Sequence, residues 1–423
     1  MQLCPKWTIF RSVIRPVRRT NLALTSGKLK LVALAHMMVS FCLAMCLFSD
    51  DDYEEVMRKL VGSLEFMRAW RDGWSMPSTA AITLARQRLG EEPLKELFSR
   101  SAVPVAAADT RGAWSGTRRL MAVDGFVLDV ADTPGNMQAF GTHNSGARAG
   151  AFPQARVVGL GECGSRAIVA ATIGSSRDSE NIMVGELLSD FGDGMLVLAD
   201  RHFYGYRLWN RARATGADLL WRINSTVGLE FVEWLPDGSW LAYVIDPEVR
   251  SGRRRRLLGR VRAGEDVAAE SVTRVRVVEY EVTNRTGNGQ GEPICLITTI
   301  LDPSEASAVE LAAAYHERWE FETGIGEVKT RLRGSGRVLR SKSPEMVRQE
   351  IWAFLLTHYA IRKLMCAAAG HTVDPDRLSF TRSLRVVRRH VTRRATFSPQ
   401  GVDQETHGDV HGDPGKTQPP PPS

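Results

Sequence analysis

The sequence has few cysteines, and none of them is arranged as a metal site or a redox pair. Six cysteines occur in 423 residues, with no Cys-x-x-Cys pair and no zinc-ligand spacing. We therefore expect buried, reduced thiols in a cytoplasmic protein. Internal repeats are also lacking, as is the Gly-x4-Gly-Lys-Ser/Thr loop that cradles nucleotide phosphates, so nucleotide hydrolysis is not indicated.

Long hydrophobic runs are almost absent, and the one exception lies near the start. Leu31 to Phe48 is an 18-residue, almost wholly apolar stretch with charged flanks, close to the minimum for a membrane span. His36 and Ser40 interrupt it, and a signal peptide would have its apolar core nearer the start. We expect a buried helix and no membrane association, with a single membrane span as the alternative.

Positive charge is in excess and is clustered. The chain carries 55 Lys and Arg against 48 Asp and Glu, a net charge of +7, which favours an anionic partner. One cluster is the unbroken run Arg253, Arg254, Arg255 and Arg256; the second is Arg382, Arg385, Arg388, Arg389, Arg393 and Arg394. Each cluster alone is equally compatible with a solvated face and with contacts to DNA.

Four polar residues share one register between Tyr315 and Lys329. Arg318, Glu322 and Lys329 follow Tyr315 at offsets of three, seven and fourteen. At about 100° per residue these positions fall within roughly 60° around one helix. That face would carry an aromatic hydroxyl, two cations and a carboxylate, a set suited to phosphates beside a metal. The alternative is an ordinary charged solvent face. Two glycines within the helix argue against it, because each costs roughly 1 kcal/mol in helix propensity.

The spacing Tyr-x2-Arg-x3-Glu-x6-Lys resembles the signature of bacterial insertion-sequence transposases of the family-four type. In that family the glutamate completes an Asp-Asp-Glu metal triad. The resemblance covers roughly residues 50 to 390 and implies this role for Glu322. It also implies that two aspartates elsewhere in the chain complete the site.

The first aspartate is predicted in the segment Arg119 to Asp129, where an apolar run reads as a buried strand. Asp124 is followed by Gly125, which would allow another backbone or a phosphate to come close. We predict that Asp124 is the first metal ligand. Asp129 and Asp132 compete for this role, because a one-residue slip in register changes which carboxylate faces the site. We expect both to lie in the following loop.

The second aspartate is predicted where another apolar strand stops. The run from Gly194 ends on Asp200, and residues at strand ends face the crevice in which open α/β sheets place their chemistry. The family resembled here carries an Asp-Arg-x-Phe/Tyr-Tyr element, and Asp200 to Tyr204 matches it. A helix N-cap is the structural alternative for Asp200, and it does not exclude catalysis.

Three carboxylates without a Cys or His cluster suit hard cations, so Asp124, Asp200 and Glu322 are expected to hold Mg²⁺ or Mn²⁺. Two ions about 3.5–4 Å apart would support in-line displacement at a phosphodiester. The expected reaction is DNA strand cleavage followed by strand transfer. Tyr315, Arg318 and Lys329 are expected to position DNA phosphates, which orients DNA without reading its sequence.

Two helices are predicted before the catalytic part, over residues 54–70 and 80–89, with Ser78 and Thr79 offering a cap for the second. They could form a helix-turn-helix-like DNA reader, in which Arg86 and Arg88 face the terminal inverted repeats of the element. A helical domain packed on its own core is the alternative.

The order of elements predicts an α/β protein with a ribonuclease H-like core, as the resemblance also implies. Core strands are predicted over 120–130, 155–160, 167–173, 195–199 and 219–223, with helices over 179–191 and 205–215. Short β runs over 231–235, 240–245, 272–282 and 294–300 predict a β-rich insertion. Trp234 and Trp240 are expected in its core, with stacking on a DNA base as the alternative. A helix is predicted over 344–369.

The predicted domains are 1–108, an all-α N-terminal DNA-binding domain whose first 30 residues diverge from the family; 109–227, the first part of the core; 228–303, the insertion; 304–370, the second part of the core; and 371–423, a basic segment and disordered tail.

The expected protein is a transposase of a bacterial insertion sequence, cytoplasmic and nucleoid-associated. Its expected partners are double-stranded DNA, comprising the terminal inverted repeats and target DNA, and a second copy of the chain, because paired ends imply a dimer in the synaptic complex. The alternative function is a catalytically inactive, decayed or repurposed DNA-binding protein of the same fold.

Overall fold

The computed structural model describes residues 26–64, 76–142, 144–145, 148–263, 265, 271–281, 293–370 and 373–392. The expectations for the first 25 residues, for Arg393 and Arg394 and for the C-terminal tail lie outside the described residues.

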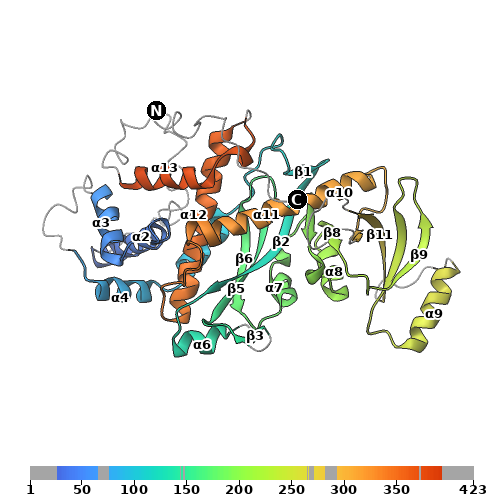
Figure 1. Cartoon of the computed structure of the whole chain (residues 1–423), viewed down its shortest axis with the longest axis horizontal. Helices are drawn as coiled ribbons and strands as arrows, with labels where there is room; N and C mark the ends of the chain where they lie inside the picture. Colours follow the sequence, from blue (N-terminus) through green and yellow to red (C-terminus); the bar gives the residue numbers. More distant parts are fainter. Residues whose placement is uncertain are drawn as a thin grey trace.

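The central part of the chain is built on a mixed sheet whose core strands are β2 (Arg118–Asp129), β5 (Gln154–Glu162), β6 (Ile168–Ser175), β7 (Met195–Ala199) and β8 (Asp218–Arg222). Their spatial order is β6-β5-β2-β7-β8. The first three form an antiparallel meander, and β7 and β8 run parallel to β2. This is the ribonuclease H-like arrangement, so the predicted fold is confirmed (Figure 1).

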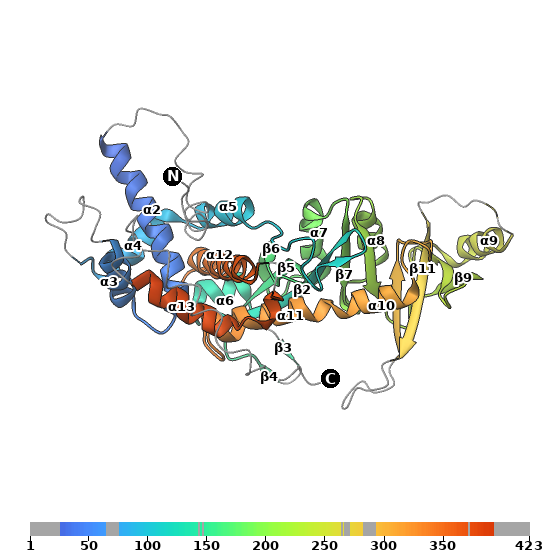
Figure 2. The same cartoon turned by 90° about the horizontal axis from the view of Figure 1, so that it is seen from above.

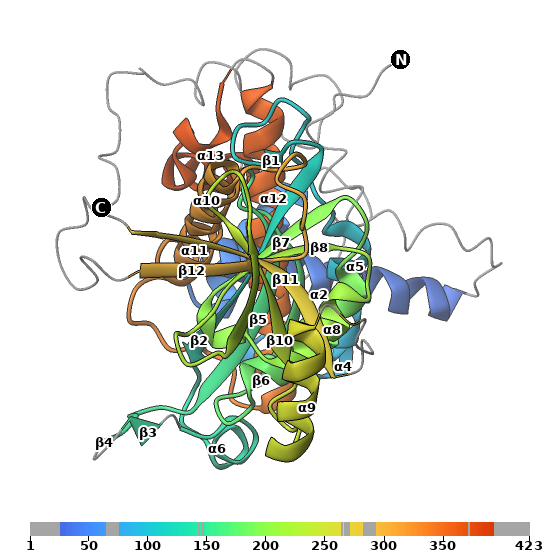
Figure 3. The ribbon, with the colours of Figure 1, turned by 90° about the vertical axis from the view of Figure 1, so that its right-hand side faces the viewer.

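The insertion extends this sheet. It comprises β9 (Leu229–Trp234), β10 (Trp240–Ile245), α9 (Ser251–Arg262), β11 (Val272–Glu281) and β12 (Pro293–Thr298). β12 pairs with β8, so the described strands continue without a break to β9 at the far end of the molecule (Figure 2). Viewed end-on, the strands fan out because the sheet is strongly twisted (Figure 3).

The arginine run of the insertion lies on a helix that the sequence did not predict. Leu257 and Val261 of α9 pack against Ile245 and Val272, while the arginines face outward or lie at the boundary. Trp234 on β9 is 68% exposed, so its predicted core position is wrong, whereas Trp240 is half-buried.

Helices cover both faces of the core sheet, and the side chains of β2 alternate between two hydrophobic cores. Leu120 and Ala122 join the core beneath α12 (Pro344–Ala369), whose bounds are as predicted. Met121 and Val123 join the core beneath α7 (Glu180–Glu186) and α8 (Tyr206–Arg213). In this part of β2, even-numbered side chains therefore face α12 and odd-numbered side chains face α7 and α8. The remaining short elements are β1 (Trp114–Ser115), α6 (Pro134–Phe140), β3 (Asn144–Ser145), β4 (Arg148–Ala149), η3 (Leu188–Asp190), η4 (Arg201–Phe203), η6 (Pro375–Arg377) and α13 (Phe380–Thr392).

The N-terminal helices are α2 (Ser26–Leu47), α3 (Tyr53–Leu64), α4 (Thr79–Leu89) and α5 (Glu92–Ser101). They share one continuous hydrophobic core with α12, with Phe41 and Val347 as members from either side. From Met38 onward the apolar stretch of α2 is buried or half-buried, as expected, whereas Leu34 is 42% exposed. Within the described ranges, none of the helices combines the length and apolarity that a membrane crossing needs. The Ser78 hydroxyl caps α4 by accepting from the Ala81 amide, as its sequence predicts.

The prediction that Arg86 faces DNA is wrong. Arg86 has no exposed surface and lies on the inner side of α4. Its Nε donates to Gln349 Oε1 at 2.9 Å and its Nη2 donates to Ser341 Oγ at 3.1 Å. The helical periodicity of α4 does not tell which face turns inward, and here the packing against α12 decides it. Arg88 is exposed.

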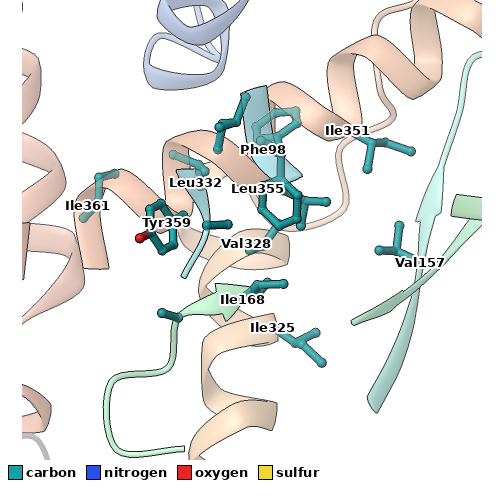
Figure 4. Packing of buried hydrophobic residues seen from close by; sticks show 14 of the residues in the cluster. Phe98, Val157, Ile168, Ile325, Val328, Leu332, Ile351, Leu355, Tyr359 and Ile361 are labelled. Atoms are coloured by element: carbon teal, nitrogen blue, oxygen red, sulfur yellow. The ribbon is translucent and has the colours of Figure 1, made fainter. Parts of the chain in front are cut away.

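The segment carrying the four-residue signature is a helical rod in three parts: α10 (Ala308–His316), α11 (Arg318–Gly326) and the π-helix η5 (Glu327–Leu332). Ile325, Val328 and Leu332 of the rod pack in one buried cluster with Leu355 of α12 and Ile168 of β6 (Figure 4). This packing fixes the rod against the meander side of the sheet.

Candidate active site

Asp124 and Asp200 occupy matched positions on neighbouring parallel strands. Val123 of β2 pairs with Ala199 of β7, and each aspartate is the next residue along its chain. Asp124 shares its parity with Ala122, so it emerges on the face that α11 covers. The topology therefore brings the two predicted aspartates together.

The competing aspartate on β2 is occupied elsewhere. Asp129 is the last residue of β2 rather than a loop residue as predicted, and its Oδ1 accepts from Gln154 Nε2 at 2.8 Å. Asp129 is five residues beyond Asp124, which places it on the other face of the strand. Asp132 follows the strand and is exposed.

Local backbone bonds orient both aspartates. The Gly125 amide donates to Asp124 Oδ1 at 2.7 Å, and the Arg201 amide donates to Asp200 Oδ1 at 2.6 Å. Asp200 thus caps the short helix η4, the alternative that the sequence left open. The space beside Gly125 holds a side chain of α7 rather than the phosphate or backbone expected there, since a Cβ on Gly125 would lie 2.9 Å from Glu180 Oε1.

Glu322 lies on α11, on the same side of the sheet as Asp124. The expectation of one uninterrupted α-helix is only partly correct, because Glu317 joins α10 to α11 with ψ near −11° and the helix widens to π geometry from Glu327. Tyr315 ends α10 and Lys329 lies in the π-helix, so the simple 100° wheel does not apply across the whole signature.

Glycines in the sheet let α11 approach closely. A Cβ on Gly161 of β5 would lie 2.0 Å from the ring of Phe321, and one on Gly159 would lie 3.4 Å from it. Phe321 is fully buried and is the neighbour of Glu322. The ring packed over two glycines therefore sets the height of Glu322 above the sheet. No local sequence signal indicates this contact, because it joins residues far apart in the chain.

The guanidinium of Arg318 lies between two of the carboxylates. Its Nη1 is 2.5 Å from Glu322 Oε1 and 3.9 Å from Asp124 Oδ2. The side chain is only 8% exposed, and its charge lies 5.7 Å from the ring centroid of Tyr315 and 5.4 Å from that of Trp319. Among the described residues, the buried Tyr315 hydroxyl and Arg318 Nε have no hydrogen-bond partner of good geometry, although the Arg318 guanidinium interacts with the Tyr315 hydroxyl.

The acidic groups influence one another electrostatically. The pKa of Asp124 is raised to about 6, mainly by burial and also by the charges of Glu322 and Asp200, while the Gly125 amide and Arg318 act in the opposite direction. Burial also lowers the pKa of Arg318, but Tyr315, Glu322 and Asp200 outweigh this effect and the pKa is raised overall. A cation placed among these carboxylates would relieve their repulsion.

The donor set fits a hard divalent cation in kind, because it consists of carboxylate oxygens whose mutual repulsion raises a pKa. As the side chains stand, no three His, Cys, Asp or Glu residues in the described part of the chain lie close enough together to hold an ion. Glu322 is turned toward Arg318, which supplies the positive charge here.

Comparison with known proteins agrees with this geometry. Residues 115–359 match the family model described as "Transposase DDE domain", which spans both aspartates and Glu322. The chain belongs to the DDE transposase family. Residues 28–99 of this DDE transposase match a second model, "Insertion element 4 transposase N-terminal", so the resemblance to the family-four type is confirmed.

The DDE transposase is 29% identical over 353 residues to "Transposase InsG for insertion sequence element IS4" of Escherichia coli (strain K12), which covers 83% of this chain and 75% of that protein. A cryo-EM structure of a piggyBac transposase synaptic complex with hairpin DNA aligns with 95% of this chain and 79% of that one, at a TM-score of 0.45 and 9% identity. The family and the insertion-sequence transposase function predicted from the sequence are confirmed, and such enzymes depend in general on divalent metal.

Proposed function

We propose that this DDE transposase binds the terminal inverted repeats of its element and catalyses DNA strand cleavage and strand transfer through Asp124, Asp200 and Glu322. The observation that carries the proposal is the matched register of Val123 and Ala199, which puts both aspartates beside each other under α11. Arg318, in contact with Glu322 and near Asp124, links the third carboxylate to this pair.

The three carboxylates would hold Mg²⁺ or Mn²⁺, with two ions as the expected number. Bound metal supplies Lewis acidity and a template for in-line displacement at phosphorus. Asp124 and Asp200 each keep one oxygen oriented by a backbone amide, which leaves the other oxygen as a donor. Glu322 would join them as the third carboxylate once its contact with Arg318 is given up.

The residues around Glu322 would grip the DNA backbone. Arg318 is released from Glu322 when a phosphate enters, and its planar fork then binds the phosphate oxygens. The buried Tyr315 hydroxyl provides a donor for a second oxygen, and half-buried Lys329 provides a point charge from the π-helix. These contacts orient the scissile bond and read no sequence.

Two further surfaces would contact DNA away from the chemistry. Arg88 on α4 is exposed, as are Arg253, Arg255 and Arg256 on α9, with Arg254 half-buried. They lie toward opposite ends of the molecule (Figure 2). A dimer at paired DNA ends, acting in the bacterial cytoplasm at the nucleoid, is the proposed working state.

The test is cleavage of linear DNA carrying the element ends, with the intact chain compared with Asp124→Ala, Asp200→Ala and Glu322→Ala. The proposal predicts nicks at the element tips that disappear in all three variants while binding of the ends persists. Binding without cleavage by the intact chain would instead identify an inactive DNA-binding protein of the same fold.

A further inference from the structure

The turn between β5 and β6 contains a residue held in an unusual backbone conformation. Among the described residues, Arg166 is the non-glycine residue with positive φ, at 56°. Side chains with a Cβ rarely adopt this region, and such residues persist where the surrounding structure over-determines them, often at functional sites. This backbone conformation sets the direction in which the Arg166 side chain leaves the turn.

Arg166 contacts acidic side chains on α11, on the π-helix and on η6; burial raises the pKa of the last of these, Asp376, to about 8. Arg166 Nη2 lies 2.5 Å from Glu320 Oε2 on α11, its Nε lies 3.2 Å from Asp376 Oδ1 on η6, and its Nη1 lies 3.8 Å from Glu327 Oε1 on the π-helix. The side chain is 13% exposed, so these contacts are screened by solvent only in part.

The backbone of Arg166 also touches α11. A Cβ on Gly324 would lie 3.0 Å from Arg166 O and 3.2 Å from Arg166 Cβ. A larger residue at 324 would therefore push α11 and the turn apart by a few tenths of an ångström. This close approach offsets the helix propensity that Gly324 costs.

These contacts all lie on the back of the helix whose front carries the chemistry. Glu320 and Gly324 are one turn apart and share a face of α11. Glu322 lies about 200° around the helix from Glu320, and Arg318 lies one turn before Glu322 on that same opposite face. A residue that holds the face of α11 with Glu320 and Gly324 therefore fixes the direction in which Glu322 on the opposite face points.

We propose that Arg166 is a positioning residue that sets the rotation of α11, and through it the placement of Glu322 relative to Asp124 and Asp200. This inference rests on the proposed metal triad. Arg166 touches neither DNA nor metal in this account; it acts through Glu320 and the close contact with Gly324.

Glu327 has partners on α12 that do not depend on Arg166. Arg362 Nε donates to Glu327 Oε2 at 2.8 Å, and His358 Nε2 lies 3.1 Å from the same oxygen. The π-helix therefore stays anchored to α12 when Arg166 is removed. Arg166→Gly also relieves the backbone strain, since glycine adopts positive φ freely.

The experiment compares the full-length chain with Arg166→Gly, Arg166→Lys, Glu320→Gln and the double variant Arg166→Gly/Glu320→Gln. Cleavage rate at saturating DNA ends, the Kd for those ends and the Tm are measured for each. Arg207→Ala is the matched control. Arg207 is an exposed arginine on α8, which covers the other face of the sheet, and it forms an ion pair with Glu248.

The expected result is a loss of roughly 10- to 100-fold in cleavage rate for Arg166→Gly, the range typical of groups that orient catalytic ligands. The Kd should stay near that of the intact chain, and because the acidic partners of Arg166 lose a counter-charge and the Tm falls, rates are compared well below the Tm of every variant. Glu320→Gln should lose rate in the same direction, and the double variant should lose less than the product of the single losses, because the pair acts as one unit. Arg166→Lys should regain part of the rate.

Full cleavage by Arg166→Gly would overturn the inference, as would a loss that merely follows a lowered Tm. If Arg166→Gly does not fold, Glu320→Gln and Arg166→Lys decide the matter by the same criteria. Cleavage that survives Asp124→Ala would refute the triad itself, and with it the role given to Arg166; loss in Asp124→Ala with full activity in Arg166→Gly would refute the positioning role alone.

Discussion

Arg318 and Glu322, one turn apart on α11, are joined by a hydrogen-bonded ion pair of 2.5 Å at the centre of the candidate site. The same guanidinium faces Asp124, so one buried cation balances two carboxylates of the triad. This arrangement gives Arg318 two successive partners in the proposed reaction, Glu322 before DNA arrives and a phosphate afterwards.

Replacing Arg318 should therefore have opposite effects on metal binding and on cleavage. Arg318→Gln removes the internal counter-charge, so Mn²⁺ should bind the DNA-free protein more tightly, by about tenfold, which corresponds to 1.4 kcal/mol. Cleavage should fall, because the phosphate loses its fork. Mn²⁺ binding followed by electron paramagnetic resonance measures the first effect. An unchanged Mn²⁺ affinity would show that Arg318 does not shield Glu322.

The packing of Phe321 over Gly161 should be sensitive to a single added side chain. Gly161→Val would collide with the ring and push α11 away from β5, at a cost of about 1–3 kcal/mol, the usual range for overpacking. Cleavage should fall more steeply than stability. The matched control is Gly192→Ala, where an added Cβ meets nothing within 4 Å. Equal effects of both substitutions on the urea unfolding curve and on cleavage would contradict this account.

The two arginines of α4 should behave differently. Arg86→Ala leaves Gln349 and Ser341 without their buried partner and should lower the free energy of unfolding by about 1–3 kcal/mol. Arg88 lies on the exposed side of α4, so Arg88→Ala should change the free energy of unfolding by less than about 0.5 kcal/mol. If Arg88 contacts the inverted repeats, Arg88→Ala should instead weaken DNA binding. Urea unfolding and a filter-binding assay separate the two, and a stable Arg86→Ala protein would contradict the buried network.

Acid should weaken the anchor between the π-helix and α12. Burial raises the pKa of Glu327, but Arg362 and His358 outweigh it and the pKa is lowered; burial lowers the pKa of His358 despite Glu327. In both cases the unfolded chain binds the proton more readily, so stability is lost as pH falls, for His358 from about pH 6.5 downward and for Glu327 from about 4.3 downward. The raised pKa of Asp124 acts with the opposite sign.

Replacing His358 isolates its contribution to the acid sensitivity of the fold. His358→Gln should flatten the fall in the free energy of unfolding between about pH 7 and 5 relative to the intact chain, because the buried neutral imidazole is gone. Urea titrations at both pH values give the slopes. An equal slope in the variant would show that His358 does not contribute to the acid sensitivity.

The sequence predicts much of the fold because its strands are locally distinctive. Met195 to Ala199 is apolar and bounded by a glycine and an aspartate, and β7 has those limits. Asp124 and Asp200 can be proposed as site residues from the sequence because an Asp-Gly pair in an apolar strand and an aspartate at a strand end are local signals. The helix α9 was missed because an arginine run offers no apolar period, only Leu257 and Val261 turning inward.

The remaining features depend on contacts between distant segments. Arg86 meets Gln349, 263 positions away, and nothing near Arg86 indicates that partner. The π geometry after Gly326 has no composition that separates it from an α-helix. The contacts of Phe321 with Gly161 and of Arg166 with Glu320 join α11 to distant strands and their turn, so no local pattern indicates them.

The measurement that tests the central claim most directly is a metal switch at Asp124. Asp124→Cys replaces a hard oxygen by a soft thiolate, which disfavours Mg²⁺ and tolerates Mn²⁺ better. The account predicts that Asp124→Cys does not cleave element ends in Mg²⁺, that Mn²⁺ restores part of the cleavage at the same nucleotides, and that Asp124→Ala is inactive in both. Cleavage by Asp124→Ala at the rate of the intact chain would contradict the assignment of Asp124 as a metal ligand.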